Sequence, residues 1–257
     1  MTIDVENFEI FSFPPYFFFA LLGIAASFTC YMFLLFASDI NVSKKNLLLC
    51  IFTIIGIMLG ARLFGVLTNI AIALYNKEKI GLDVIYKAGL VYYGGLFGGI
   101  FCYWIGTRVL FKNQNVKLLL NPLAVSIPLF HSFGRLGCMF AGCCYGKEYH
   151  GFGHINYIRD GVTTETFPVQ ALESVTELSI FCFMLVKYCI SKNKQNENML
   201  INYFILYAIG RFFIEFLRGD PNRGCFGILS FSKMVSVMLF IFCIFFLLTI
   251  GRKNENN

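Results

Sequence analysis

Residues 16–37 have the sequence YFFFALLGIAASFTCYMFLLFA, which contains no Asp, Glu, Lys or Arg. A helix needs about 20 mostly apolar residues to cross the hydrocarbon core of a bilayer, so this stretch is long enough to span one. The acidic residues Asp4, Glu6 and Glu9 precede it, whereas a cleaved signal peptide begins with basic residues and ends at small ones. We therefore interpret 16–37 as a retained transmembrane helix.

Other stretches of the chain have the same apolar character. The expected spans are approximately 16–37, 47–67, 89–111, 118–141, 171–190, 199–217 and 228–250. The connectors are short and polar apart from 68–88 and 142–170, and no Pro- or Ser-rich linker divides the chain. The sequence therefore predicts an all-α integral membrane protein, a seven-transmembrane-helix bundle in which residues 1–257 form a single polytopic domain.

The overall composition favours this class and excludes others. Only 14% of the 257 residues are charged and 57% are hydrophobic, whereas soluble domains carry about 25% charged residues. A chain this apolar is not disordered, because disorder needs low hydrophobicity and high net charge. The net charge is +6, but Lys and Arg are scattered rather than gathered on one face, so we expect no nucleic-acid partner.

The distribution of Lys and Arg around the spans predicts the orientation. If the N-terminus is outside, the short inner connectors hold more Lys and Arg than the longer outer ones, as the positive-inside rule requires. The expected topology therefore has the N-terminus outside and the C-terminus in the cytoplasm. The two long connectors then face outward.

Several ionisable side chains lie within the expected spans, where each costs about 2.5–3.5 kcal/mol at mid-bilayer. They are Arg62, His131, Arg135, Glu173, Glu177, Arg211, Glu215 and Lys233. Such residues are functional candidates by default, although Arg211 and Glu215 lie four apart and could neutralise each other, with Arg218 one turn later. Glu177 and Lys233 lie nearer to helix ends, where we expect snorkelling or pairing.

The fourth span carries an unusual polar face. His131, Arg135 and Cys138 are spaced i, i+4 and i+7, so they share one side of the helix. The sequence does not provide enough buried carboxylates to pair with all of the arginines Arg62, Arg135 and Arg211. Guanidinium groups grip phosphate bidentately and stay charged when desolvated, so the pattern indicates a phosphate-bearing lipid inside the bundle. An enzyme and a lipid transporter fit that reading equally.

Six short motifs lie in order along the spans. They are Pro15-Tyr16 followed by Gly23; Gly60-Ala61-Arg62-Leu63; Gly89-Leu-Val-Tyr-Tyr-Gly94-Gly95-Leu-Phe-Gly98-Gly99; Gly134-Arg135-Leu-Gly137-Cys-Met-Phe-Ala-Gly142-Cys-Cys-Tyr-Gly146; Phe167-Pro168-Val-Gln170-Ala-Leu-Glu173; and Tyr207-Ala-Ile-Gly210-Arg211-Phe-Phe-Ile-Glu215-Phe-Leu-Arg218. In this order and spacing they resemble the bacterial prolipoprotein diacylglyceryl transferase family, from residue 15 to about residue 235.

The resemblance implies a multi-pass enzyme of the bacterial cytoplasmic (inner) membrane with seven helices, surrounded by membrane lipids. Such an enzyme moves the diacylglyceryl group of phosphatidylglycerol onto the thiol of a prolipoprotein lipobox cysteine and releases glycerol phosphate. The resemblance implies neither a cofactor nor a metal. Matched by position, Arg135 is similar to the family's phospholipid-binding arginine and Arg211 to its essential arginine in the sixth helix. The positions expected to bind or line the substrate are Arg135, Tyr16, Arg62, Gly94, Gly95, Gln170, Glu173, Glu215 and Arg218.

Two motifs depart from the family pattern. Tyr93 stands where a His-Gly-Gly motif usually has its histidine, and Cys138, Ala141 and Cys143 replace two Asn and a Glu. These changes concern the acceptor and the proton transfer more than the phospholipid donor. A divergent paralogue with the same donor and another acceptor, and a non-catalytic lipid-binding or flipping protein, are the alternatives.

The substitutions allow two interpretations. His131 could replace the missing base, because an imidazole titrates near pH 6.5, with Tyr93 donating a hydrogen bond to the phosphate; the alternative is that His131 bonds a neighbouring helix. The second interpretation gives a role to Cys138, Cys143 and Cys144, as a covalent relay, a disulfide, or metal ligands together with His150 or His154. Their spacing is not a regular zinc pattern, so we expect simple small-residue packing.

Overall fold

The computed structural model describes residues 1–5, 8, 10, 13–38, 44–75, 77, 81, 85–86, 88–89, 91–110, 116–194, 198–219, 225–226 and 229–255. The chain divides into two compact units. The first contains Met1–Ser38 and Lys117–Asn257, and the second contains Asp39–Val116. The prediction of a single domain stays a prediction.

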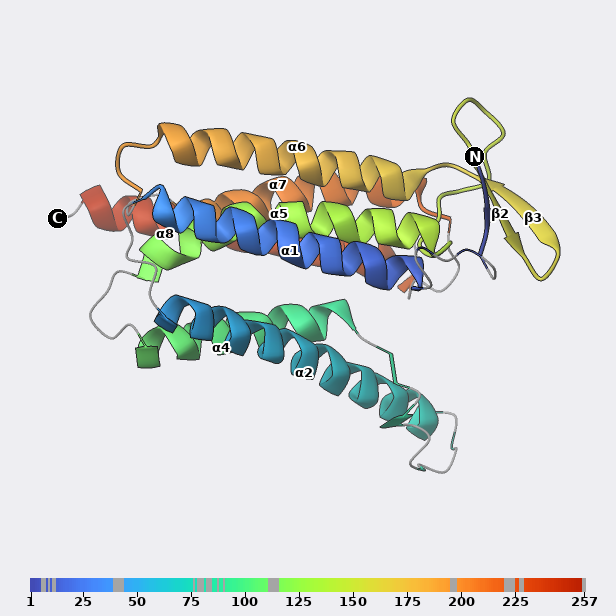
Figure 1. Cartoon of the computed structure of the whole chain (residues 1–257), viewed down its shortest axis with the longest axis horizontal. Helices are drawn as coiled ribbons and strands as arrows, with labels where there is room; N and C mark the ends of the chain where they lie inside the picture. Colours follow the sequence, from blue (N-terminus) through green and yellow to red (C-terminus); the bar gives the residue numbers. More distant parts are fainter. Residues whose placement is uncertain are drawn as a thin grey trace. The chain divides into compact units, whose positions relative to one another are not determined.

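The first unit is a bundle of helices that run side by side (Figure 1). Its helices are α1 (Pro15–Phe36), α5 (Val116–Phe140), α6 (Val169–Ile190), α7 (Met199–Ile214) with the 3-10 turn η1 (Glu215–Leu217), and α8 (Phe231–Glu255). The apolar core joins α1, α5, α6 and α7 through Leu34, Val125, Met184 and Tyr203, all of them buried. Half of the apolar window of α5 is buried, against 22% in α1, so α5 is the inner helix.

The second unit pairs α2 (Lys44–Tyr75) with α4 (Tyr92–Leu110). The two helices approach so closely that backbone meets backbone. A Cβ atom on Gly60 would collide with the carbonyl oxygen of Gly94, and one on Gly98 with that of Gly56. Glycines at such a contact allow close packing of apolar helices. The Gly94-Gly95 motif therefore has a packing role in this unit.

A small sheet lies at one end of the first unit and was not predicted from the sequence. Strands β1 (Thr2–Asp4), β2 (Ile155–Arg159) and β3 (Val162–Thr166) form it in that order. β1 is parallel to β2, and β2 and β3 form an antiparallel hairpin. The hairpin turns at Asp160 and Gly161, both with positive φ, which is the geometry that Asp-Gly favours between strands. A second strand pair joins β4 (Cys225–Phe226) and β5 (Leu229–Ser230). The all-α prediction was therefore incomplete, because the connector 142–170 contains strands.

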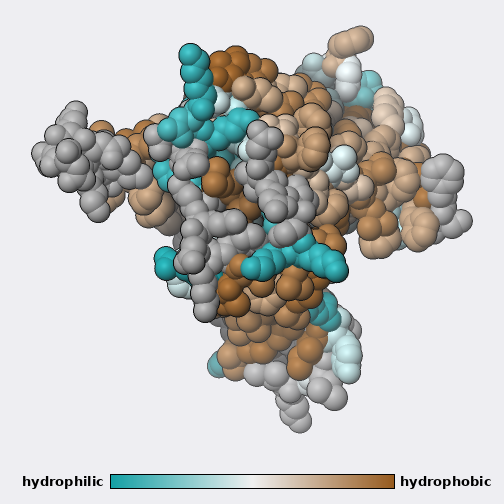
Figure 2. All heavy atoms as spheres, turned by 60° about the vertical axis from the view of Figure 1, so that its left-hand side comes forward, coloured by the Kyte–Doolittle hydropathy of each residue, from teal (hydrophilic) through white to brown (hydrophobic). Residues whose placement is uncertain are grey.

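Each expected span coincides with a helix. Among the described residues, five helices are long and apolar enough to cross a membrane: α1, α2, α5, α6, and α7 extended by η1. The apolar part of α8 that qualifies is shorter, Lys233–Leu248. Large apolar side chains are exposed along these helices, Phe33 and Ile190 among them, and Figure 2 shows brown, hydrophobic residues over much of the visible face. The fold is therefore mostly helical with a surface suited to lipid.

Candidate active site

Glu173, in the second turn of α6, is the centre of a buried ionic network. Its Oε2 atom lies 3.2 Å from Arg135 Nη1 of α5, and its Oε1 atom accepts a hydrogen bond from Arg211 Nη1 of α7. Arg218, just after η1, has its Nη1 atom 3.8 Å from the same Oε1. Only 4% of the Glu173 side chain is exposed. One carboxylate thus holds three guanidinium groups from separate elements, an arrangement in which removing the anion leaves buried cations without their counter-charge.

Arg211 also pairs along its own helix with Glu215, whose Oε2 lies 2.9 Å from Arg211 Nη2. The i, i+4 neutralisation predicted as an alternative is therefore present, together with the bond to Glu173. The expectation of too few carboxylates was wrong for this unit, because Glu173, Glu177 and Glu215 are all buried within it. Any anionic ligand must compete with these carboxylates for the arginines.

His131 connects two charged neighbours. Its Nε2 atom lies 3.4 Å from Arg135 Nη2, and its Nδ1 atom lies 3.2 Å from Glu177 Oε1 and 3.4 Å from the Tyr203 hydroxyl. Because a guanidinium nitrogen can only donate, Nε2 is the acceptor in the contact with Arg135, and Nδ1 faces Glu177. The ring also packs against Tyr207, with centroids 5.4 Å apart. His131 is therefore a fixed member of the network.

Glu177, Tyr203 and Tyr207 belong to this site, because all three contact His131. None of them is among the site residues predicted from the sequence. Glu177 was expected near a helix end, but it is 5% exposed and faces the same space as Glu173, four residues earlier on α6. That i, i+4 spacing was the signal in the sequence. A small pocket between α5, α6 and α7 is lined by His131, Arg135, Glu173, Thr176, Glu177, Ile180, Tyr207, Gly210, Arg211 and Ile214.

Arg62 and Tyr93 belong to the other unit. Arg62 donates to the backbone carbonyls of Ile85, Tyr86 and Ala88, so its guanidinium serves the segment that precedes α4. Tyr93 is in the first turn of α4, and its side chain lies outside the described residues. Their predicted contacts with substrate stay predictions.

Tyr16 and Gln170 lie at the end of the bundle that carries the sheet. Tyr16, in the first turn of α1, is about half exposed and packs over Gly137 of α5, where a Cβ atom would come within 3.3 Å of the Tyr16 Cα. Gln170 is fully buried, and its Nε2 donates to the carbonyl of Cys143 and to the hydroxyl of Tyr157. Burial raises the pKa of Tyr157, which keeps its hydroxyl protonated as the donor to the Met139 carbonyl. Gln170 therefore fixes the loop that follows α5.

That loop is also attached to the segment that carries Arg218. The amide of Lys147 donates to the carbonyl of Leu217, and the amide of Gly219 donates to the carbonyl of Tyr145. A Cβ atom on Gly219 would collide with the carbonyl of Gly146. These contacts hold Arg218, which is 5% exposed, beside Glu173.

The end of α5 brings the cysteines together. Gly142, with φ +64°, ends the helix, and its amide donates to the Met139 carbonyl while the amide of Cys143 donates to the Cys138 carbonyl. These two bonds form a Schellman motif, in which the residue after the left-handed glycine lies beside the residue five positions earlier. Cys143 therefore lies beside Cys138. Cys144 has φ +60°, which directs the chain so that its thiol returns to the other two.

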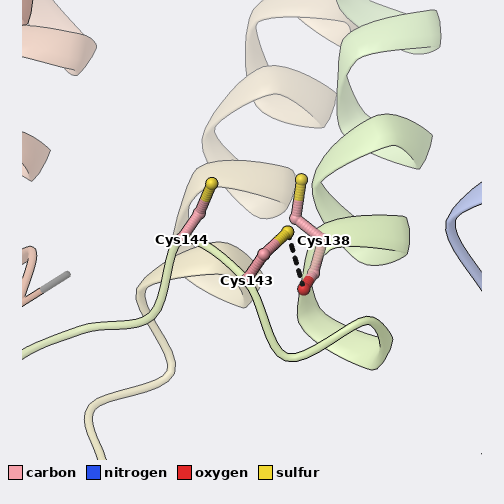
Figure 3. Close-up of side chains that lie close together, drawn as sticks. All are labelled: Cys138, Cys143 and Cys144. Carbon is pink, nitrogen blue, oxygen red and sulfur yellow. Dashed lines mark hydrogen bonds between the residues drawn. The ribbon is translucent and has the colours of Figure 1, made fainter. Parts of the chain in front are cut away.

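The three sulfur atoms lie within 4.8 Å of one another, and the thiols are free (Figure 3). Hydrogen bonds from Cys138 and Cys143 lower the pKa of Cys144, and the positive charges of Arg218 and Arg135 lower it further. His150 and His154 do not join them, because His150 contacts Glu165 and Glu148, and His154 contacts the Gly151 carbonyl. The cluster consists of thiols alone in the part of the chain that the structure describes.

Comparison with known proteins gives one family. The family model of prolipoprotein diacylglyceryl transferase matches residues 5–249. A phosphatidylglycerol--prolipoprotein diacylglyceryl transferase 2 from Clostridium perfringens (strain 13 / Type A) is 30% identical over 237 residues, covering 91% of this chain and 90% of its own. The phosphatidylglycerol--prolipoprotein diacylglyceryl transferase of Clostridium tetani (strain Massachusetts / E88) is 33% identical over 195 residues, 75% of each chain. That of Clostridioides difficile (strain 630) is 32% identical over 205 residues, 78% of this chain and 76% of its own.

Proposed function

This chain belongs to the prolipoprotein diacylglyceryl transferase family, and from that premise we propose that it transfers the diacylglyceryl group of phosphatidylglycerol to a prolipoprotein. The acceptor is the thiol of the lipobox cysteine, and glycerol phosphate is released. The protein is a multi-pass membrane enzyme. Its finer placement is part of the proposal: seven spans in the bacterial inner membrane, with the N-terminus outside and the C-terminus in the cytoplasm.

The convergence of Arg135, Arg211 and Arg218 on Glu173 is the observation that carries the proposal. The phosphodiester of the donor has the same single negative charge as the carboxylate, so it replaces Glu173 as the partner of Arg135 and Arg211. As the bond to the diacylglyceryl group breaks, the departing phosphate gains a second charge. Preorganised cations placed where charge develops lower the barrier, and each such contact is typically worth about 2.7–4 kcal/mol.

His131 receives the proton that the acceptor thiol gives up. In the structure its Nε2 lone pair accepts a hydrogen bond from Arg135. When Arg135 turns to the phosphate, that lone pair becomes available, while Glu177 at Nδ1 stabilises the imidazolium that forms. Donor binding and proton uptake are coupled in this way, because one guanidinium group serves both. The roles expected from the sequence for Tyr93, Tyr16, Arg62 and Gln170 in contacting the substrate remain part of the proposal, and they rest on the family motifs alone.

The experiment is transfer by the purified full-length chain. It is incubated with phosphatidylglycerol radiolabelled in its acyl chains and with a lipobox peptide, and the label on the peptide is counted. We expect label on the peptide with cysteine and none on the same peptide with serine. Arg135→Ala should reduce the transfer by about 10²–10³-fold, whereas Arg108→Ala, at the end of α4, should not reduce it. A wild-type protein that binds the lipid but never labels the peptide would make the chain a lipid-binding protein instead.

A further inference from the structure

The thiols of Cys138, Cys143 and Cys144 are not explained by packing alone. Their sulfur atoms face the same space beside the last turn of α5 (Figure 3), within 4.8 Å of one another. A tetrahedral zinc ion with Zn–S bonds of about 2.3 Å needs sulfurs about 3.8 Å apart, so small side-chain rotations suffice. Three thiolates with no histidine or carboxylate among them are soft ligands, which select a thiophilic metal rather than Mg²⁺ or Ca²⁺.

We propose that Cys138, Cys143 and Cys144 bind a zinc ion with an open fourth position, and that the thiol of the acceptor cysteine occupies this position as a thiolate. The inference rests on the proposed function, because it assigns the site to the acceptor. Zinc sites that carry out chemistry have three protein ligands and one exchangeable position, whereas structural sites are closed by four. Among the residues that the structure describes, the cluster supplies three ligands, which leaves the fourth position for the acceptor.

The location of the cluster suits this role. His131, Arg135 and Cys138 share one face of α5, with Arg135 between the other two in sequence. A phosphate held by Arg135 therefore has the thiol cluster one turn away on one side and the imidazole one turn away on the other. The backbone carbonyl of Cys143 also accepts a hydrogen bond of 2.8 Å from Gln170 Nε2. The backbone of Cys143 is thus held between the end of α5 and the start of α6.

The ligands also neutralise the charge of the metal. Zinc with three protein thiolates has a net charge of −1, and the acceptor thiolate makes it −2. Arg135 lies three residues before Cys138 on the same face of α5, so a guanidinium group is near the cluster. A cation with this ligand set is therefore not left as an unpaired charge inside the membrane protein.

The chemical need is the activation of the acceptor. A free thiol with a pKa near 8.5 is only about 3% ionised at neutral pH, and the thiolate is the nucleophile. Coordination to a metal deprotonates a thiol outright. The released proton passes through water to His131. The metal-bound sulfur then donates its electron pair to the glyceryl carbon, the C–S bond forms, and the C–O bond breaks with its electrons leaving on the phosphate oxygen. The product is a neutral thioether, a weaker ligand than a thiolate, so it departs from the metal.

A covalent relay through one of the three thiols does not fit this chemistry. It would alkylate an enzyme cysteine to a thioether, and breaking that C–S bond again would require a thiolate to leave from carbon. The acceptor thiol must therefore attack the lipid directly, and the role left to the cluster is to hold that thiol.

The first test measures the metal site without activity. The reduced, purified full-length chain is loaded with Zn²⁺, passed through gel filtration and assayed for zinc by mass spectrometry. We expect one ion per chain in the wild type and in Cys182→Ser/Cys189→Ser, two exposed thiols of α6, and a loss of at least tenfold in Cys138→Ser/Cys144→Ser. Because the latter variant could misfold, maleimide labelling of the wild type serves as a second measurement. Zinc should protect Cys138, Cys143 and Cys144 and leave Cys182 and Cys189 reactive; equal labelling with and without zinc overturns the site.

The second test addresses the open position. Co²⁺ replaces zinc, and its absorption bands report thiolate ligands and tetrahedral geometry. A lipobox peptide with cysteine should shift these bands, and the serine peptide should not; identical spectra with both peptides overturn the role of the fourth position.

The transfer assay separates this inference from the proposed function. Protein stripped by a chelator should transfer the lipid at least about tenfold more slowly, given the small thiolate fraction without metal, and added zinc should restore the rate. Full transfer by the stripped protein overturns the zinc site and leaves the transferase function intact. Cobalt bands that respond to the cysteine peptide, together with no transfer under any condition, support the site and contradict the function.

Discussion

Replacing Glu173 by Gln removes the charge of the carboxylate and keeps its shape, so it tests the central contact of the network. The wild-type side chain is 4% exposed and faces three guanidinium groups, with Arg135 at 3.2 Å and Arg218 at 3.8 Å. Removing one partner of a buried ion pair typically costs about 3–5 kcal/mol, because the remaining charge is left desolvated. We expect Glu173→Gln to lose stability of that order, with Glu215 still pairing Arg211 and holding the loss near the lower limit.

An added anion should reverse this loss. In Glu173→Gln the arginines lack their central carboxylate, so glycerol phosphate in solution can take its place. A ligand at 100 times its dissociation constant stabilises a folded protein by about 2.7 kcal/mol. Both effects can be measured by thermal unfolding in detergent micelles. The unfolding is monitored with a thiol-reactive dye that labels buried cysteines as they become exposed. The melting temperature of Glu173→Gln should fall and then rise with glycerol phosphate, while the wild type responds far less.

The control is Glu148→Gln, which removes an exposed carboxylate from the same unit. Exposed ion pairs contribute little, so its melting temperature should equal that of the wild type and should not respond to the anion. The reasoning is refuted if Glu173→Gln melts like the wild type, or if glycerol phosphate stabilises all the proteins equally. The first result would mean that the network contributes no net stability, and the second that the anion binds elsewhere.

Other consequences can be measured on the same purified chain. Arg135→Ala and Arg211→Ala should each reduce the transfer rate by about 10²–10³-fold, and Arg135→Lys should not restore it, because a lysine lacks the bidentate geometry; a double variant that still transfers lipid would rule out the assignment. His131→Ala should flatten the pH dependence of the rate, and an unchanged profile would mean that another group takes the proton. On the β2–β3 side, the hydrogen bond from His150 to Glu165 raises the pKa of His150 and lowers that of Glu165. The stability that this pair contributes is therefore lost as the pH rises through the raised pKa of His150. It is also lost as the pH falls through the lowered pKa of Glu165. Hydrogen exchange at the hairpin should show both losses, and Glu165→Gln should remove this pH dependence.

The helices followed directly from the sequence, because long apolar runs admit few other structures. The strands did not, although a local signal for the hairpin was present: Asp160-Gly161 lies between the alternating residues 155–159 and 162–166. The position of residues 142–170 between two expected spans favours a loop, and this expectation hides the local strand signal. The pairing of β1 with β2 had no local signal, since two segments at opposite ends of a long stretch of chain meet in it.

The site shows the same division between local and tertiary information. The pairing of Arg211 with Glu215 depends on helical spacing and was predictable. The position of Glu173 among arginines from three elements depends on how α5, α6 and α7 face one another, which spacing within one helix does not determine. The meeting of Cys138 and Cys143 was within reach, because Gly142 is typical of the left-handed residue that ends a helix. The return of Cys144 was not, because few non-glycine residues adopt its positive φ.

The parallel pairing of β1 with β2 can form only late in the synthesis of the chain. Thr2–Asp4 is synthesised before its partner Ile155–Arg159, which follows only after α1, α2, α4 and α5 have been made. The N-terminal amine also donates to the carbonyl of His154. Strand β1 therefore joins β2 only after the intervening helices have been made. An affinity tag fused to Met1 would burden this late step, whereas one fused after α8 would leave it undisturbed.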